Sequence, residues 1–350
     1  MDVTSKVELI VRNTEEVITV DDLKQLLESN PSPRGYIGVE PSGLFHIGWI
    51  IWVNKLKDLM NAEVDMTFLE ATWHAWINDK FGGNISLINT CAEYIEHCLR
   101  ALGVEVSKLK FVKAEELVDE KEYWEGVLKI AKSLSLSRVK RAVTIMGRKE
   151  EESIMDFSKL IYPCMQVEDI FFLDLDICLG GMDQRKAHVL AREVAERYGY
   201  KKPIAIHTPL LSGLQGGGRM DSDDKIVECK MSKSKPETCI FIHDSPEVIK
   251  EKISRAYCPP KEIDGNPVID IARWIILYDG REAIINRPMK YGGDLTIEST
   301  SELLSLYSKG ELHPLDLKNF VAEELIKMLA PVREYFETKK EAKLLLQQLK

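Results

Sequence analysis

Two short strings, far apart in the chain, carry residue types suited to binding phosphate groups. Residues 46–48 read His-Ile-Gly, and residues 230–234 read Lys-Met-Ser-Lys-Ser. An imidazole N–H, lysine ammonium groups and serine hydroxyls can all donate hydrogen bonds to phosphate oxygens. Gly43 and Gly48 have no side chain, so a nucleotide could approach the backbone closely there. Together the strings predict a site for the phosphates of a nucleotide.

The sequence around the first string indicates how it is held. Residues 36–48 read as a short apolar strand, a Pro-Ser-Gly turn and the first turn of a helix. Such a strand-loop-helix unit is a common phosphate site, because backbone N–H groups at the helix start point at the anion. Each string alone has an ordinary explanation, a helix cap for the histidine and a solvated loop for the lysines. Their presence together, in this order, favours the phosphate site.

The paired strings resemble the signatures of class I aminoacyl-tRNA synthetases, which activate an amino acid with ATP and transfer it to tRNA. The resemblance implies that His46, Gly48, Lys230 and Lys233 are catalytic. It also implies an ATP-binding set made of Gly43, His46, Gly48, Lys230, Ser232, Lys233 and Ser234. The sequence departs from many members at Trp49, where they have a second histidine.

Longer strings extend this resemblance to the archaeal type of tyrosyl-tRNA synthetase. They are residues 35–43, 161–170, 180–186, 292–296 and 312–319. The likeness covers most of residues 34–336 and implies that the substrates are L-tyrosine, ATP and tRNA(Tyr). Mg²⁺ is expected with ATP because it neutralises the phosphates.

The same resemblance implies a tyrosine pocket. Tyr36 and Asp169 would bind the substrate hydroxyl, which is both a donor and an acceptor. Tyr162, Gln166 and Gln184 would bind the ammonium group. The spacing of Tyr162, Gln166 and Asp169 (i, i+4, i+7) places them on one helix face. The alternative to a ligand-binding role is that these side chains form a polar contact between packed helices.

One departure from the family lies in residues 72–76, which read Thr-Trp-His-Ala-Trp. His74 keeps the place of a family histidine and could line the ATP or tyrosine site, whereas Thr72 replaces a common aspartate. A role for an acid at that position is therefore not expected here.

For tRNA, the resemblance implies that Arg185 and Lys186 lie toward the acceptor stem. Tyr291 would stack on the first anticodon base and Asp316 would accept hydrogen bonds from it, as is usual for unpaired RNA bases. The ordinary alternative for Asp316 is a place beside a helix N-cap.

Alternating apolar strands and amphipathic helices predict an α/β fold: a Rossmann-type catalytic domain with a parallel sheet and a helical insertion, followed by a helix-rich C-terminal domain. We expect a helical leader at 1–33, a catalytic domain at 34–240 and an anticodon-binding domain at 241–350. The catalytic domain would include the insertion at about 115–165 and the lysine-serine loop at 216–236.

Composition sets further limits. The 350-residue chain carries a net charge of -9, so a tRNA partner requires a local basic face. Its seven cysteines include no C-x-x-C pair, which indicates reduced thiols, a cytoplasmic location and no zinc or other protein-bound metal. No segment is long and apolar enough to predict a membrane span. A homodimer is expected from the family alone.

Two alternative functions stay open. A tryptophan-specific relative would share the fold, although Tyr36 with Asp169 favours a substrate hydroxyl over an indole N–H. A paralogue that binds RNA or nucleotide without ligase activity would lack amino-acid-dependent pyrophosphate exchange.

Overall fold

The computed structural model describes residues 1–147, 156–216 and 229–350. Part of the predicted insertion (148–155) and part of the predicted lysine-serine loop (217–228) lie outside the described residues. The chain forms two compact units. The first contains residues 1–43, 52–209 and 344–350, and the second contains residues 44–51 and 210–343. The limits of the three domains expected from the sequence stay a prediction.

A six-stranded sheet runs through the first unit in the order β1-β6-β5-β2-β3-β4, within the described residues. The strands are β1 (Glu16–Ile18), β2 (Arg34–Val39), β3 (Asp65–Glu70), β4 (Lys110–Lys113), β5 (Ile177–Gly181) and β6 (Ile204–Thr208). Strands β2 to β6 are parallel, and β1 adds an antiparallel edge on β6. The predicted Rossmann-type α/β fold is thus confirmed.

The strand order reverses direction between β2 and β5. From β2 the chain builds outward through β3 and β4, then returns to place β5 on the other side of β2, with Tyr36 opposite Cys178. In open α/β sheets, ligands bind beyond the carboxyl ends of the strands at such a reversal. The residues that follow β2 and β5 are therefore the first place to look for a site.

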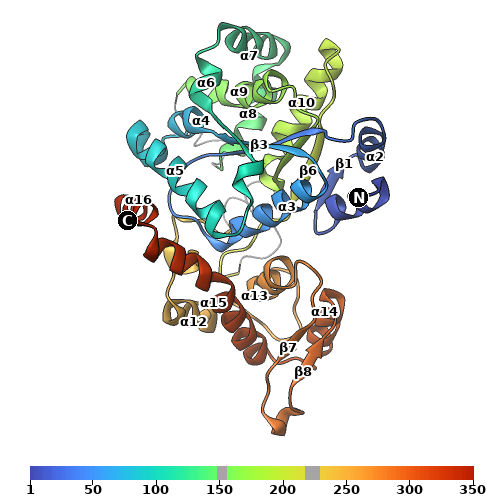
Figure 1. Cartoon of the computed structure of the whole chain (residues 1–350), viewed down its shortest axis with the longest axis vertical. Helices are drawn as coiled ribbons and strands as arrows, with labels where there is room; N and C mark the ends of the chain where they lie inside the picture. Colours follow the sequence, from blue (N-terminus) through green and yellow to red (C-terminus); the bar gives the residue numbers. More distant parts are fainter. Residues whose placement is uncertain (148–155, 217–228) are drawn as a thin grey trace. The chain divides into compact units, whose positions relative to one another are not determined.

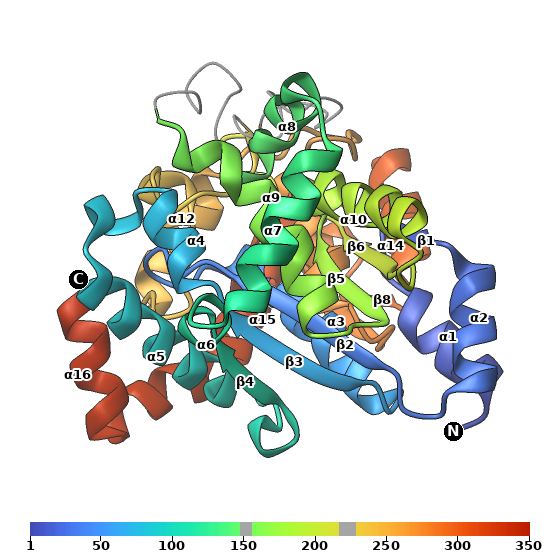
Figure 2. The same cartoon turned by 90° about the horizontal axis from the view of Figure 1, so that it is seen from above.

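Helices cover both faces of this sheet (Figures 1 and 2). One face carries α3 (Ile50–Asn61) and α5 (Ile85–Ala101), and the other carries α7 (Lys121–Ser133), α9 (Ser158–Phe172) and α10 (Arg185–Tyr198). The remaining helices of this unit are α1 (Val3–Val11), α2 (Val20–Ser29), α4 (Thr72–Ile77), α6 (Ala114–Val118) and α8 (Leu136–Ala142).

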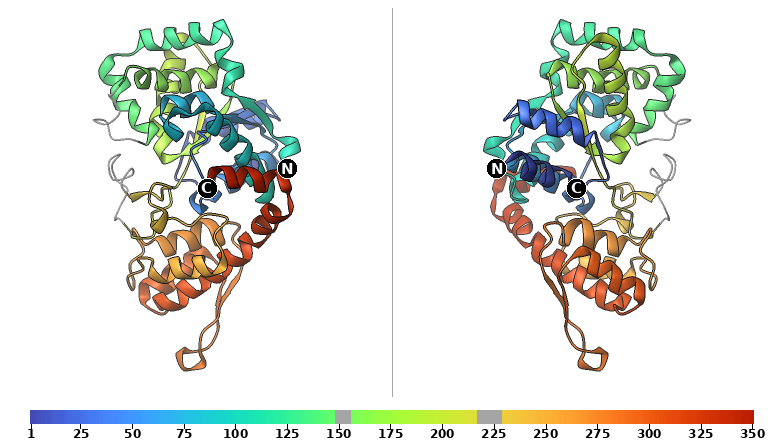
Figure 3. Two further views of the ribbon diagram at one scale, coloured as in Figure 1. Left: turned by 90° about the vertical axis from the view of Figure 1, so that its left-hand side faces the viewer. Right: turned by 90° about the vertical axis from the view of Figure 1, so that its right-hand side faces the viewer.

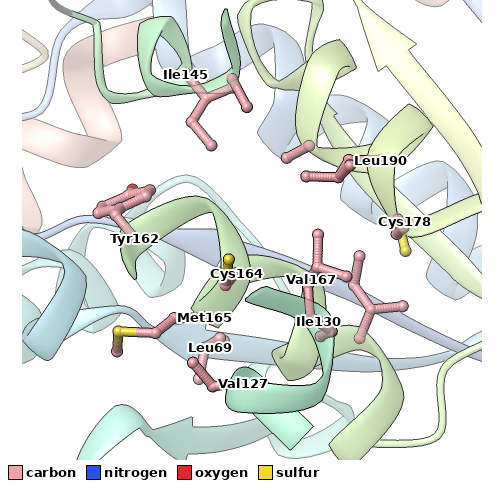
Figure 4. Close-up of a cluster of buried hydrophobic side chains, with 14 of the residues drawn as sticks. Leu69, Val127, Ile130, Ile145, Tyr162, Cys164, Met165, Val167, Cys178 and Leu190 are labelled. Carbon is pink, nitrogen blue, oxygen red and sulfur yellow. The ribbon is translucent and has the colours of Figure 1, made fainter. Parts of the chain in front are cut away.

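The main core of the first unit lies where α7 and α9 pack on the sheet (Figure 4). Leu69 of β3, Val127 and Ile130 of α7 and Val167 of α9 are all at most 2% exposed. Each fully buried aliphatic side chain contributes about 1.5–3 kcal/mol of transfer free energy. This packing fixes the position of α9, the helix that carries most of the predicted tyrosine-binding residues.

The predicted helical leader at 1–33 contains a strand that the sequence interpretation missed. Only three residues form β1, too few for an alternating apolar pattern to show. Its stability comes instead from pairing with β6, where Glu16 lies opposite His207.

The second unit is mainly helical, with α12 (Pro246–Arg255), α13 (Pro267–Ile271), α14 (Thr300–Lys309) and α15 (Pro314–Thr338). The last helix, α16 (Lys340–Leu349), begins in this unit, and its residues from 344 onward belong to the first. The second unit also contains an antiparallel hairpin, β7 (Ala283–Ile285) and β8 (Leu295–Ile297), whose tip extends away from the helices of this unit (Figure 3). The spacing of apolar residues in 296–306 predicts an amphipathic helix that starts at residue 296. The helix begins at Thr300 instead, where the Ser299 hydroxyl caps it by accepting from the Glu302 N–H.

Candidate active site

The first string lies at a helix start, as predicted. His46 is the N-cap residue of a 3-10 turn (Ile47–Trp49) that leads into α3. The backbone N–H of Ile47 donates to the Ile240 carbonyl at 2.9 Å, so a segment of the second unit fixes the turn. Gly43 has a φ of 120°, a conformation that favours glycine.

The imidazole of His46 is buried and uncharged. Burial lowers its pKa well below the usual value, and the nearby Lys233 and Lys230 ammonium groups lower it further. Its Nδ1 atom has no hydrogen-bond partner among the described residues. A Cβ at Gly48 would lie 3.0 Å from the ring, so glycine leaves His46 its space. A neutral imidazole can donate one N–H to a phosphate oxygen without adding charge.

The second string lies beside the first within the second unit. Met231 N–H donates to the Leu211 carbonyl at 2.7 Å, which fixes the backbone of the string, and the Ser232 and Ser234 hydroxyls are 2.9 Å apart. The Lys233 ammonium lies 3.9 Å from the centroid of the Trp49 ring. The structure therefore brings a lysine of one string to the end of the other.

The predicted tyrosine-binding residues belong to the first unit, where Asp169 is central. It is 1% exposed, on the face of α9 that also carries Tyr162 and Gln166. Burial, with Cys178 and Asp169 adding to it, raises the pKa of Tyr36 well above its usual value, so this phenol stays protonated. A protonated phenol inside β2 and a carboxylate on α9 thus lie near each other, a donor and an acceptor for a hydroxyl ligand.

Two contacts of Asp169 were not predicted. The buried Tyr123 of α7 donates its hydroxyl to Oδ1 at 2.8 Å, and His74 Nε2 of α4 lies 3.1 Å from Oδ2. Burial lowers the pKa of His74, but the Asp169 and Glu40 carboxylates outweigh it and raise the net value. The sequence pointed to His74 only by position, and nothing in the sequence marked Tyr123. Both orient the carboxylate.

The predicted ammonium-binding residues form a second group. Gln166 Nε2 donates to Gln184 Oε1 at 3.0 Å, and Gln184 Nε2 donates to the Ile145 carbonyl at 3.1 Å. These bonds orient both amides, and Gln166 Oε1 is left buried without a partner among the described residues. Such an acceptor suits a cationic ligand, because a buried polar atom normally requires a partner.

A carboxylate that the sequence interpretation did not assign stands beside this group. Glu40 accepts from the Tyr162 hydroxyl at 2.5 Å and from Asn78 Nδ2, which lies 3.0 and 3.1 Å from its two oxygens and also donates to the Met146 carbonyl at 2.9 Å. Lys80 lies 3.4 Å from its Oε2. Glu40 therefore adds negative charge where only neutral acceptors were expected. Glu40 directly follows β2 and lies in the string 35–43, which the resemblance had already marked. That position was the one feature of the sequence that could have pointed to it.

The predicted tRNA-binding residues occupy separate places. Arg185, at the start of α10, forms two bonds to Glu16 at 2.8 and 2.9 Å, and Lys186 donates to the Arg141 carbonyl at 3.1 Å. Tyr291 ends a short turn at the tip of the hairpin, and Asp316 lies in the first turn of α15. The N-cap of α15 is His313, which accepts from the Leu315 N–H.

Metal and membrane features are absent from the described residues. No group of three or more His, Cys, Asp or Glu side chains there could hold a metal ion. No helix of that part is long and apolar enough to cross a membrane.

A Rossmann-type sheet that carries candidate phosphate-binding and tyrosine-binding residues is the arrangement expected of a class I aminoacyl-tRNA synthetase. The family model described as tRNA synthetases class I (W and Y) matches residues 28–330, so the chain belongs to this family of enzymes. The chain is 54% identical over 353 residues to the tyrosine-tRNA ligase of Sulfurisphaera tokodaii, covering all of this chain and 97% of that one.

Solved structures agree with this assignment. The crystal structure of tyrosyl-tRNA synthetase from Aeropyrum pernix matches with a TM-score of 0.89 and 49% identity, covering 100% of this chain and 99% of that one. The enzyme from Pyrococcus horikoshii, solved with L-tyrosine, matches with a TM-score of 0.90 and 41% identity over 99% and 100% of the two chains. The resemblance to archaeal tyrosyl-tRNA synthetases is confirmed.

Proposed function

We propose that the chain is a tyrosine-tRNA ligase, which forms tyrosyl-adenylate and pyrophosphate from tyrosine and ATP and then transfers tyrosine to the 3′ end of tRNA(Tyr). The observation that carries the choice of amino acid is the buried Asp169 carboxylate near the protonated Tyr36. The similarity to the tyrosine-tRNA ligase of Sulfurisphaera tokodaii and to the Pyrococcus horikoshii enzyme solved with L-tyrosine supports the same substrate.

In this proposal the tyrosine side chain lies with its hydroxyl between Tyr36 and Asp169. Tyr36 donates to the hydroxyl oxygen of the substrate and Asp169 accepts a hydrogen bond from its O–H, so both functions of the phenol are satisfied. Phenylalanine would leave the two buried groups unpaired, a penalty that gives about 10⁵-fold discrimination in tyrosine-specific sites. Tryptophan has a donor but no acceptor for Tyr36.

The substrate ammonium group would contact Tyr162, Gln166 and Gln184, with Glu40 supplying a negative charge nearby. The unpaired Gln166 oxygen supports this assignment, because an ammonium N–H would satisfy it. Holding the ammonium and the phenol at opposite ends fixes the orientation of the substrate and leaves its carboxylate as the group that can react.

In the activation step, a carboxylate oxygen of tyrosine attacks the α-phosphorus of ATP, and the bond to the β-phosphate oxygen breaks as pyrophosphate leaves. Negative charge grows on the leaving group, so cations and N–H donors there stabilise the transition state. We assign this role to His46, Lys230 and Lys233, with Gly43, Gly48, Ser232 and Ser234 lining the phosphates. ATP enters as its Mg²⁺ complex, and we propose that the protein itself holds no zinc.

For the transfer step, we propose that Arg185 and Lys186 contact the acceptor end, whereas Tyr291 and Asp316 read the anticodon. The hairpin tip supports this division, because single-stranded bases are usually recognised by side chains that stack and read base edges. The domain limits proposed above follow the same division, with catalysis in residues 34–240 and anticodon binding in 241–350.

We further propose that the enzyme is a homodimer that works in the cytoplasm, where translation takes place. Exposed apolar side chains of the first unit support the dimer. They come from α7, α8 and the end of α10: Trp124, Leu128, Leu136, Tyr198 and Tyr200.

ATP-pyrophosphate exchange without tRNA tests the choice of substrate. Exchange is expected with tyrosine and not with phenylalanine or tryptophan; exchange with tryptophan would contradict the pocket assignment. In Asp169→Asn, kcat/KM for tyrosine should fall at least about 10-fold, because a hydrogen bond to a charged group is lost, while the KM for ATP changes little. Glu168→Gln, one residue away on α9, is the matched control and should keep tyrosine activation. Equal losses in both variants would contradict the role of Asp169.

A further inference from the structure

Trp49 stands where many members of the family have histidine, and the proposed function gives it no role. Its ring meets Phe45 edge-on, with centroids 4.9 Å apart at 85°, and its centroid is 5.4 Å from that of His46. Phe45 is fully buried, and the backbone N–H of Trp49 donates to the His46 carbonyl at 3.0 Å, which fixes the main chain that carries the ring. The indole is therefore held in a defined place beside His46.

The Lys233 ammonium lies over this ring, 3.9 Å from its centroid. A cation within about 6 Å of an aromatic centroid is attracted by the negative face of the ring, and tryptophan has the strongest such face. An ammonium group in this position still has N–H donors directed away from the ring. All these contacts belong to the second unit.

The contact with Trp49 restrains a lysine side chain that the rest of the lysine-serine string restrains little. Residues 234–237, which follow Lys233, are exposed, so little packing restrains the string on that side. A lysine side chain loses much rotational freedom when it is fixed in one place, and a contact made before the substrate arrives removes part of that cost from the reaction.

We propose that Trp49 is a positioning residue whose ring face holds the Lys233 ammonium beside His46, so that the lysine is placed for the pyrophosphate leaving group before ATP binds. This inference rests on the proposed function, because that function assigns Lys233 to the leaving group. Trp49 therefore acts on the phosphates only through Lys233, whereas a histidine at this position could contact them directly.

Pyrophosphate exchange in a double-mutant cycle tests the proposal. Trp49→Leu keeps an apolar side chain without a π face, and its kcat should fall about fivefold, which is about 1 kcal/mol. Trp49→Phe keeps an aromatic face and should retain most of the rate. In a Lys233→Ala background, Trp49→Leu should have no further effect. Equal losses in Trp49→Leu and Trp49→Phe, or losses that multiply with that of Lys233→Ala, would overturn the proposal in favour of a packing role.

Tryptophan fluorescence of the ATP-free protein tests the contact independently of activity. Lys233→Ala should change the emission of the wild-type protein but not that of Trp49→Phe, and Lys235→Ala, on the same segment, should change neither. An unchanged emission in Lys233→Ala would overturn the inference. Absence of tyrosine-dependent exchange in the wild-type protein would instead contradict the proposed function, so the two failures are distinguishable.

Discussion

At the residue scale, the candidate site shows what a sequence can and cannot reveal about chemistry. The strings around His46 and Lys233 were visible because their residue types and order are distinctive. Tyr123 was not visible, since its role depends on Asp169, 46 residues later in the chain, and only the packing of α7 on α9 brings the two together. Contacts of this kind follow from the fold and leave no local pattern.

Glu70 is a second residue whose environment the sequence does not disclose. It ends β3, is 1% exposed, and neither carboxylate oxygen has a hydrogen-bond partner among the described residues. Burial, with a contribution from the Glu96 carboxylate, raises its pKa to about 7. A buried unpaired carboxylate opposes folding once it is ionised, because it loses its hydration.

This predicts a pH-dependent effect of Glu70→Gln, which resembles the protonated acid. Since the folded-state pKa is raised, the stability linked to Glu70 is present below pH 4.5 and is lost as pH rises through 7. The variant should match the wild-type protein near pH 4.5 and be more stable by up to about 3 kcal/mol at pH 8. Thermal unfolding at both pH values measures this. A variant that is less stable at pH 8 would show that the ionised carboxylate has a partner.

At the element scale, long regular segments were predictable and short ones were not. Apolar residues at helical intervals predict a helix at about 86–103, and α5 covers Ile85–Ala101, with Ile88, Ile95 and Leu99 buried. Strands β1, β7 and β8 have three residues each, too short for periodicity, and they form because a partner strand satisfies their backbone groups. Propensity therefore identifies the large elements, and pairing determines the small ones.

The contact between α7 and α9 gives a prediction at this scale. Alanine normally stabilises a helix by about 1 kcal/mol relative to glycine. At Gly126 of α7, however, an added Cβ would lie 2.1 Å from the buried carboxyl of Glu168 on α9. Gly126→Ala should therefore lower stability by about 1–3 kcal/mol, because the helices must separate or the carboxyl must move.

Chemical denaturation of four proteins measures this effect: wild type, Gly126→Ala, Glu168→Ala and the double variant. With the carboxyl absent, Gly126→Ala should become neutral or stabilising, as helix propensity dictates. The same loss of stability in both backgrounds would place the strain elsewhere in α7.

At the scale of the whole molecule, the sequence predicted the Rossmann-type sheet and a helix-rich C-terminal part, and both were found. The contact-defined units differ from the expected segments: residues 1–33 and 344–350 group with the catalytic part, whereas residues 44–51 and 210–240 group with the C-terminal part. The reason is pairing within that unit, since Ile242 N–H donates to the Phe45 carbonyl at 3.1 Å. A segment's place in the chain does not reveal such long-range pairing.

The proposed homodimer gives the last prediction, because subunit association belongs to this scale. Leu128 of α7 is 68% exposed, and Trp124, one turn earlier, is 36% exposed. Tyr198, at the end of α10, donates its hydroxyl to the Lys129 carbonyl, so α7 and α10 present these apolar groups on one surface. Exposed apolar surface of this kind is typical of protein interfaces, whose centres are poor in charged residues.

A charge placed in this surface should therefore prevent association. Light scattering after size exclusion should give the wild-type protein about twice the 39.9 kDa chain mass, and Leu128→Glu a single chain mass, because an unpaired carboxylate would have to be buried on association. Ile284→Glu is the matched control: Ile284 is 55% exposed on the hairpin of the second unit, and its substitution should leave the dimer intact. If Leu128→Glu is still a dimer, the interface must lie on another surface. A monomeric wild-type protein would contradict the proposed dimer.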